Sequence, residues 1–185
     1  MHKIQKQTAW WIFVLVGIGV LSRLIPHMYN FTPLGAIALF SAAYVGRKSL
    51  SLLVPIITLW ISDILLNNFL YSEYVSGWGR CFGFGWSYLG FILIVGLGWL
   101  ALKKINLWTV LGSSVAASVV FFLVSNFGSW LGSTLYAQNT SGLLLCYAAG
   151  IPFFWKTLAG TVFFSLVFFN SYEWSSSRKL IWEKA

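Results

Sequence analysis

Residues 50–71 read LSLLVPIITLWISDILLNNFLY, an apolar run that contains a single acidic residue, Asp63. About 20 apolar residues are enough to cross the hydrocarbon core of a bilayer as a helix. Pro55 is expected to kink this helix. An ionisable side chain at membrane depth is costly and usually faces a cavity or a partner inside the bundle. The segment therefore predicts a transmembrane helix with one polar position that points inward.

Further apolar runs lie on both sides of this segment. They are continuous rather than alternating in polarity, which excludes an outer-membrane β-barrel. The predicted spans are residues 9–25, 34–46, 50–71, 87–102, 108–126 and 152–172. A glycine- and aromatic-rich loop (72–86) and a long uncharged stretch (127–150) are expected to connect later spans. We therefore expect an all-α integral membrane bundle of six transmembrane helices, forming a single domain over residues 1–185.

The composition agrees with a membrane protein. Of the 185 residues, 58% are hydrophobic and 9% are charged, whereas a soluble domain carries roughly a quarter charged residues. The basic N-terminus lacks a convincing small-residue cleavage site, so we expect the first span to be retained. The net charge of +8 is explained by the basic ends of membrane helices and does not indicate a nucleic-acid partner.

The basic residues also predict an orientation, because cytoplasmic segments of membrane proteins are enriched in lysine and arginine. With both termini in the cytoplasm, the inner segments hold most of the basic residues: Lys3, Lys6, Arg47, Lys48, Lys103, Lys104, Arg178, Lys179 and Lys184. The outer side holds Arg23, Arg80 and Lys156. These exceptions are explained either by contact with lipid headgroups or by a role at the outer end of the bundle.

The residues that could bind a ligand or take part in chemistry are also predicted to lie at the outer end. Asp63 is expected either to form a structural pair with Arg23 or Lys156, to cap a broken helix, or to line a cavity open to the outside. Cys81 lies in the sequence GRCFG beside Arg80, and a neighbouring cation favours the thiolate, which is the nucleophile and metal ligand. The alternatives for Cys81 are a buried apolar residue or a disulfide with Cys146.

Motifs of enzymes are mostly absent. The sequence contains no GxSxG, HExxH or phosphate-binding loop. Only four residues are acidic, so a mechanism that uses paired acids is disfavoured. Since no nucleotide-binding element is present, ATP-driven transport would need a partner protein.

Three segments carry a resemblance to a known family. They are RLIPHMYNFTPLGAIALFSAAYVGRK (23–48), ISDILL (61–66), and SNFGSWL (125–131) followed by GLLLCYAAGIPFFWKTLAGTVFF (142–164). Together they resemble small bacterial membrane proteins related to the substrate-binding S-components of energy-coupling factor (ECF) vitamin transporters. Within these, the chain looks most like the BtuM group of solitary cobalamin transporters.

The resemblance implies a function. The chain would bind cobalamin from the outer side of the bacterial inner membrane, with no intrinsic cofactor, acting alone or with an ECF transmembrane and ATPase module. Cys81 would ligate the cobalt and could displace its cyanide, which is ligand exchange rather than turnover by an acid and a base. His27, Asp63 and Arg80 would lie at the binding site. The group's tyrosine is matched by Tyr88, and its arginine by Lys156, which cannot copy a bidentate arginine contact.

Three alternatives remain at this point, one of which is a structural or assembly subunit with no ligand. The same fold could carry another small vitamin-like solute. The chain could instead belong to another functional class, as a membrane thiol enzyme or redox protein that uses Cys81 and Cys146.

Overall fold

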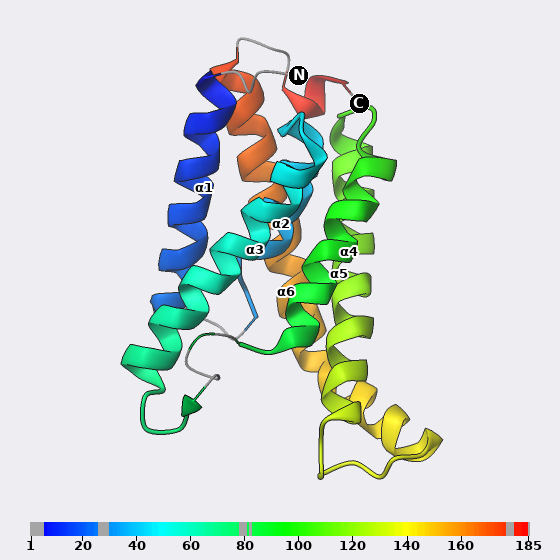
Figure 1. Cartoon of the computed structure of the whole chain (residues 1–185). Coiled ribbons are helices and arrows are strands. Elements are labelled where there is room, and N and C mark those ends of the chain that lie inside the picture. Colours follow the sequence, from blue (N-terminus) through cyan, green and yellow to red (C-terminus); the bar gives the residue numbers. More distant parts are fainter. Residues whose placement is uncertain (1–5, 26–29, 78–80, 82, 177–179, 185) are drawn as a thin grey trace.

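The computed structural model describes residues 6–25, 30–77, 81, 83–176 and 180–184. Within these residues the chain forms six α-helices, in agreement with the predicted all-α class (Figure 1). Their bounds are α1 Lys6–Leu24, α2 Leu34–Tyr44, α3 Lys48–Leu65, α4 Gly85–Ala101, α5 Leu107–Leu131 and α6 Thr140–Ser175. A π-helical segment, η1 (Leu66–Leu70), extends α3, and a short 3-10 helix, η3 (Ile181–Lys184), follows α6.

Among the described residues, four helical segments are long and apolar enough to cross a membrane: Gln7–Leu24, Lys48–Leu70, Leu107–Leu131 and Thr140–Ser175. The other two, α2 and α4, are apolar but have only 11 and 17 residues. At 1.5 Å per residue, α2 is roughly 16 Å long and crosses only about half of a hydrocarbon core.

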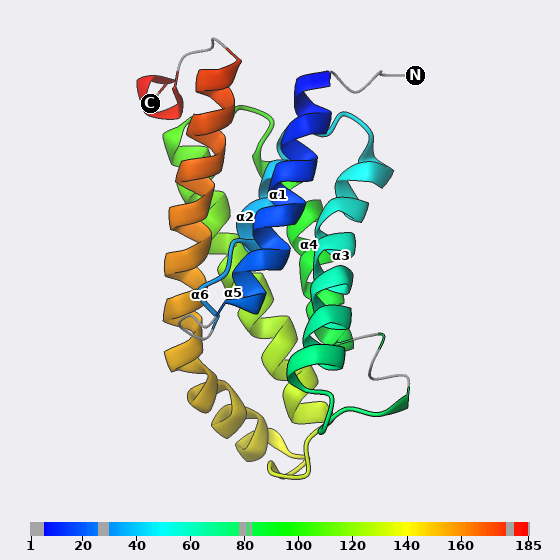
Figure 2. The same cartoon turned by 90° about the vertical axis from the view of Figure 1, so that its left-hand side faces the viewer.

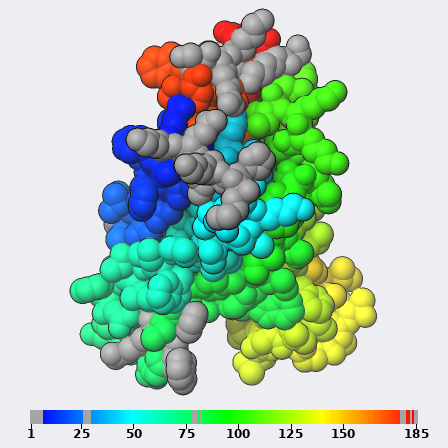
Figure 3. Space-filling model, turned by 45° about the horizontal axis from the view of Figure 1, so that its top comes forward, coloured from blue at the N-terminus to red at the C-terminus, as the bar shows by residue number. Residues whose placement is uncertain are grey.

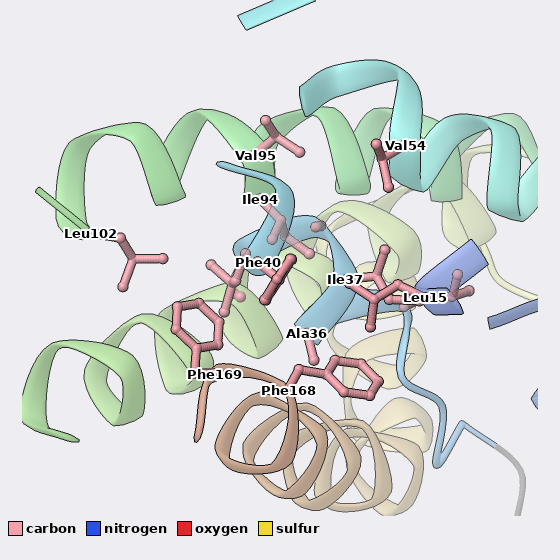
Figure 4. Close-up of a cluster of buried hydrophobic side chains, with 14 of the residues drawn as sticks. Leu15, Ala36, Ile37, Phe40, Val54, Ile94, Val95, Leu102, Phe168 and Phe169 are labelled. Atoms are coloured by element: carbon pink, nitrogen blue, oxygen red, sulfur yellow. The ribbon is translucent and has the colours of Figure 1, made fainter. Parts of the chain in front are cut away.

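The short helix α2 is the centre of the bundle. It contacts each of the other five helices, and every residue from Leu34 to Ser41 is buried. Its small residues let neighbouring helices approach closely, as is common where apolar packing alone cannot drive association in lipid. Phe40 anchors one cluster, lying 5.7 Å from the ring of Phe169 and 4.8 Å from that of Tyr44 between centroids. Figure 4 shows Phe40 among core side chains from the surrounding helices.

The beginning of α1 and the end of α6 lie together at one end of the bundle. The Thr8 and Tyr172 hydroxyls are 3.0 Å apart, and Gln7 Nε2 donates to Ser175 Oγ at 3.0 Å. Lys48, which begins α3, places its Nζ 5.3 Å from the centroid of the Trp99 ring near the end of α4. The opposite end is formed by the last turns of α3 and the turn between α5 and α6, which project as separate lobes at the lower edge of Figure 3.

One sequence-based boundary is wrong. Residues 127–150 were expected to form a long connection, but α5 continues to Leu131 and α6 begins at Thr140. Asn139 caps α6 by accepting a hydrogen bond from the Gly142 N–H, which is the usual role of asparagine at a helix start. The remaining turn is closed by hydrogen bonds from Trp130 Nε1 to the Ala137 carbonyl and from Gln138 Nε2 to the Trp130 carbonyl.

Helix α6 is consequently the longest element, with 36 residues and Pro152 inside it. A straight helix of this length would measure roughly 54 Å, well beyond the thickness of a hydrocarbon core. Figure 2 shows its N-terminal part, coloured yellow to gold, turning away from the axis of the rest. A proline inside a helix removes a backbone hydrogen bond and is a common cause of such a bend.

The contact between α2 and α4 gives a test of this packing. A Cβ added at Gly98 would lie 2.6 Å from the Ala42 Cβ, whereas a Cβ at Gly96 meets nothing within 4 Å. We expect Gly98→Ala to destabilise the protein by about 1–3 kcal/mol through overpacking. Gly96→Ala is the matched control and should leave stability unchanged or slightly raised, because alanine favours helix. Thermal unfolding in detergent compares them, and equal melting temperatures for both variants would contradict the close α2–α4 approach.

Candidate functional site

Asp63 is the polar centre of the end opposite the termini. It lies in the last turn of α3, and its side chain is only 5% exposed. Its Oδ1 is 2.6 Å from Arg23 Nη1, at the end of α1. Its Oδ2 accepts hydrogen bonds from the Tyr88 hydroxyl at 2.7 Å and from the Gly83 N–H at 3.1 Å. One carboxylate therefore ties α1, α3, α4 and the segment before α4 together.

Arg23 is held by more than the ion pair. Its Nη1 also donates to Ser62 Oγ and to the Leu59 carbonyl, so all of its partners among the described residues lie in α3. Burying a charge away from water is costly, and a close partner with additional hydrogen bonds offsets much of that cost. Of the alternatives that the sequence left open for Asp63, the structure shows the pairing with Arg23, while Lys156 forms no ion pair with any described residue.

Gly83 is required by this arrangement. A Cβ at this position would overlap the Asp63 carboxylate, so only glycine lets the backbone N–H approach the acid so closely. The next ordered element, α4, begins two residues later at Gly85. The Asp63 carboxylate therefore also fixes where the chain enters α4.

A cavity of about 140 Å³ lies in the middle of the bundle next to Arg23. All six helices contribute to its walls, together with the segment before α2. Its lining residues are Arg23, Asn30, Thr32, Leu34, Gly35, Leu59, Ser87, Phe91, Ile94, Ala117, Ser118, Phe121, Thr157 and Thr161. The wall is thus a mixture of hydroxyls, one amide and one guanidinium with aromatic and aliphatic side chains, which is typical of small-molecule sites.

A second cavity of about 410 Å³ adjoins the first and shares Asn30, Ser87 and Phe121 with it. Its other lining residues are Phe84, Ser125, Asn126, Ser129, Tyr136, Cys146, Ala149, Gly150 and Phe153. They belong to the start of α4, to the parts of α5 and α6 near the turn that joins these two helices, and to that turn. The first cavity, called the inner cavity below, and the second, called the outer cavity, together form one polar depression that leads from the end of the bundle opposite the termini toward its centre.

The predicted site residues do not all meet in this depression. Asp63 and Tyr88 are in direct contact. Cys81 is exposed and Lys156 is half-buried, and neither borders the two cavities as far as the structure describes them. His27 and Arg80 lie outside the described residues.

The two cysteines are not joined. Cys81 and Cys146 are both free, and Cys146 is buried with its thiol 3.4 Å from the Asn126 carbonyl. The sequence left a disulfide open, and the structure contradicts it. Among the described residues no three histidine, cysteine or acidic side chains come together as a metal site, but a single thiolate that ligates a metal already held by another molecule needs no such group.

Sequence reasoning missed the hydroxyls that line the inner cavity. Ser118, Thr157 and Thr161 lie in apolar helices, where serine and threonine usually bond back to the helix. Ser118 and Thr157 do so, donating to the Ser114 and Phe153 carbonyls. Only the packing of the six helices shows that they face a common space.

The ion pair yields a second prediction. Asp63→Asn leaves the Arg23 charge without a carboxylate, and we expect a loss of about 3 kcal/mol in unfolding free energy. Glu73→Gln, which removes an exposed carboxylate, should change stability by less than about 0.5 kcal/mol. Titration with a denaturing detergent measures both.

A compensating variant separates lost charge pairing from general damage. Replacing both residues, as Arg23→Met with Asp63→Leu, should recover part of the loss because no unpaired buried charge remains. A double variant that is less stable than Asp63→Asn alone would contradict the role of charge pairing.

Comparison with known proteins gives one match. A protein-family model described as a family of unknown function (DUF6580) matches residues 3–182 of the chain. No curated protein and no solved structure matches the chain.

Proposed function

The chain belongs to the family of unknown function DUF6580, and we propose that this member is a solute-binding membrane transporter of the S-component type. It crosses the bacterial inner membrane six times, with both termini in the cytoplasm, and takes up its solute from the outer side. It acts alone or with an ECF transmembrane and ATPase module.

The polar depression carries this proposal. The guanidinium of Arg23, which is paired with Asp63, and several hydroxyls line a space in the centre of an otherwise apolar bundle. Polar and ionisable groups at membrane depth are expensive and mark solute or ion pathways more often than not. A cavity lined by every helix of the bundle suits a binding protein better than a purely structural subunit, whose interior would be filled with side chains.

The distribution of charge supports the orientation. Arg47 precedes α3, Lys48 begins it, and Lys103 and Lys104 follow α4, at the end where α1 begins and α6 ends. The depression opens at the other end. By the positive-inside rule the basic end is cytoplasmic, so the depression faces outward.

Cobalamin is the first solute to test. Cys81 is an exposed thiol two residues before Gly83, whose N–H contacts Asp63. A thiolate is a polarisable donor suited to a transition metal, and in cyanocobalamin it would replace cyanide on the cobalt, with cyanide leaving as the free anion. A corrinoid is larger than the two cavities, so it would rest at the outer end with only a peripheral group inside.

The volumes of the cavities favour a second candidate, a smaller solute bound by the same fold. Cavities of about 140 and 410 Å³ together reach the lower part of the range that drug-sized ligands occupy. A thiol redox function is less well supported, because one cysteine is exposed and the other is buried.

The visible spectrum of cyanocobalamin distinguishes these candidates. Purified protein incubated with cyanocobalamin should retain the red chromophore and shift its bands as sulfur replaces cyanide. Cys81→Ala should abolish the shift, whereas Cys146→Ala, the matched control at the buried thiol, should preserve it. A wild-type protein that elutes colourless after incubation would exclude cobalamin and leave the smaller solute.

A further inference from the structure

The inner cavity has an unusual balance of hydrogen-bonding groups. Arg23 uses only Nη1 in its bonds to Leu59, Ser62 and Asp63. Toward the described residues its Nε and Nη2 therefore remain unused donors. An arginine carries five N–H donors and no acceptor, so the cavity wall keeps donor capacity at this point.

The parts of the wall that α5 and α6 form supply acceptors. Ser118 Oγ donates to the Ser114 carbonyl at 2.8 Å, and Thr157 Oγ1 donates to the Phe153 carbonyl at 3.1 Å. Each hydroxyl donates its single proton to a backbone carbonyl of its own helix but keeps lone pairs that can accept a hydrogen bond. Both side chains line the cavity, so they can accept a hydrogen bond from a group bound there.

Thr161 adds a third hydroxyl to the cavity wall. It is only 2% exposed and lines the same cavity. A hydroxyl can both donate and accept a hydrogen bond, so Thr161 adds capacity for either role at this wall.

The charge of the cavity limits what can fill it. Arg23 is the charged residue among the lining residues, and Asp63 already compensates it at 2.6 Å. An anionic group in the same space would add an uncompensated negative charge in a medium of low dielectric constant, and such a charge is strongly disfavoured. The space therefore suits a neutral group that accepts and donates hydrogen bonds at once.

We propose that the inner cavity binds an uncharged carboxamide-type group of the solute. Its carbonyl oxygen accepts from Nε or Nη2 of Arg23, which make no hydrogen bond with the described residues, and its N–H groups donate to Ser118 and Thr157. The remainder of the solute extends past Phe121 into the outer cavity, which shares that residue. A volume of about 140 Å³ has room for a terminal group of this size but not for a whole vitamin. This inference rests on the proposed function, because it specifies which group of the solute enters the bundle.

Benzamide and benzoate form a matched pair of probes, since they share size and shape but differ in charge. We expect benzamide to bind the full-length protein in neutral-lipid nanodiscs saturably, as measured by ligand-observed NMR. Benzoate should bind at least about tenfold more weakly. Saturable binding of neither probe would mean that the cavity holds only water and would overturn the inference, as would equal affinity for both.

Two serines on α5 provide the matched variants. Ser118 lines the cavity, and Ser114, one turn earlier, is equally buried and donates to the Val110 carbonyl at the same 2.8 Å without lining it. We expect Ser118→Ala to weaken benzamide binding about three- to tenfold, the effect of one lost hydrogen bond, and Ser114→Ala to change it less than about twofold. Thr157→Val, which keeps the shape of threonine, should match Ser118→Ala. Equal affinity in all three variants would overturn the inference.

The cobalamin proposal and the carboxamide proposal are tested by separate results. If the protein binds cyanocobalamin but not benzamide, the transporter stands and the carboxamide subsite is wrong. If benzamide binds with the expected variant pattern and cyanocobalamin does not, the subsite stands and the solute is a different amide.

Discussion

The ion pair between Arg23 and Asp63 is the interaction on which the half of this bundle opposite the termini depends. Two opposite charges inside an apolar structure must be paired closely or not be present at all. Their pairing joins α1 to α3, and the second carboxylate oxygen joins the Gly83 backbone and Tyr88 at the start of α4. The same constraint that stabilises the helices also places a guanidinium beside the central cavity.

The cavity itself follows from the shortness of α2. This helix begins at Leu34, well inside the bundle, and fills the half that carries the termini. Other helices extend past its N-terminal end, so the space beyond its first turn is not filled by a helix. That space is the inner cavity, and Leu34 and Gly35 form part of its wall. The half of the bundle that α2 fills is closely packed, and the other half contains the cavity. This arrangement is suited to holding a solute.

The sequence predicts much of this fold because long, continuous apolar runs rarely form anything other than buried or membrane-spanning helices. For Asp63 it leaves two candidate partners, Arg23 and Lys156, because few cations lie outside the basic end, and only the packing of the helices distinguishes them. It does not predict the ends of α5 and α6, because the polar residues around Ser133 and Asn139 resemble a loop until their capping bonds are seen. Ser118, Thr157 and Thr161 line a common cavity only because of how separate helices pack. A local sequence pattern does not show this packing.

The central claim is that the polar depression opens on the outer side of the membrane, opposite the basic end. Accessibility of introduced thiols tests it most directly, in a Cys81→Ala/Cys146→Ala background in spheroplasts. A cysteine introduced as Ser129→Cys, in the wall of the outer cavity, should react with a membrane-impermeant maleimide before lysis. A cysteine introduced as Lys104→Cys should react only after lysis. Labelling of position 104 in intact spheroplasts, with position 129 protected until lysis, would contradict the account.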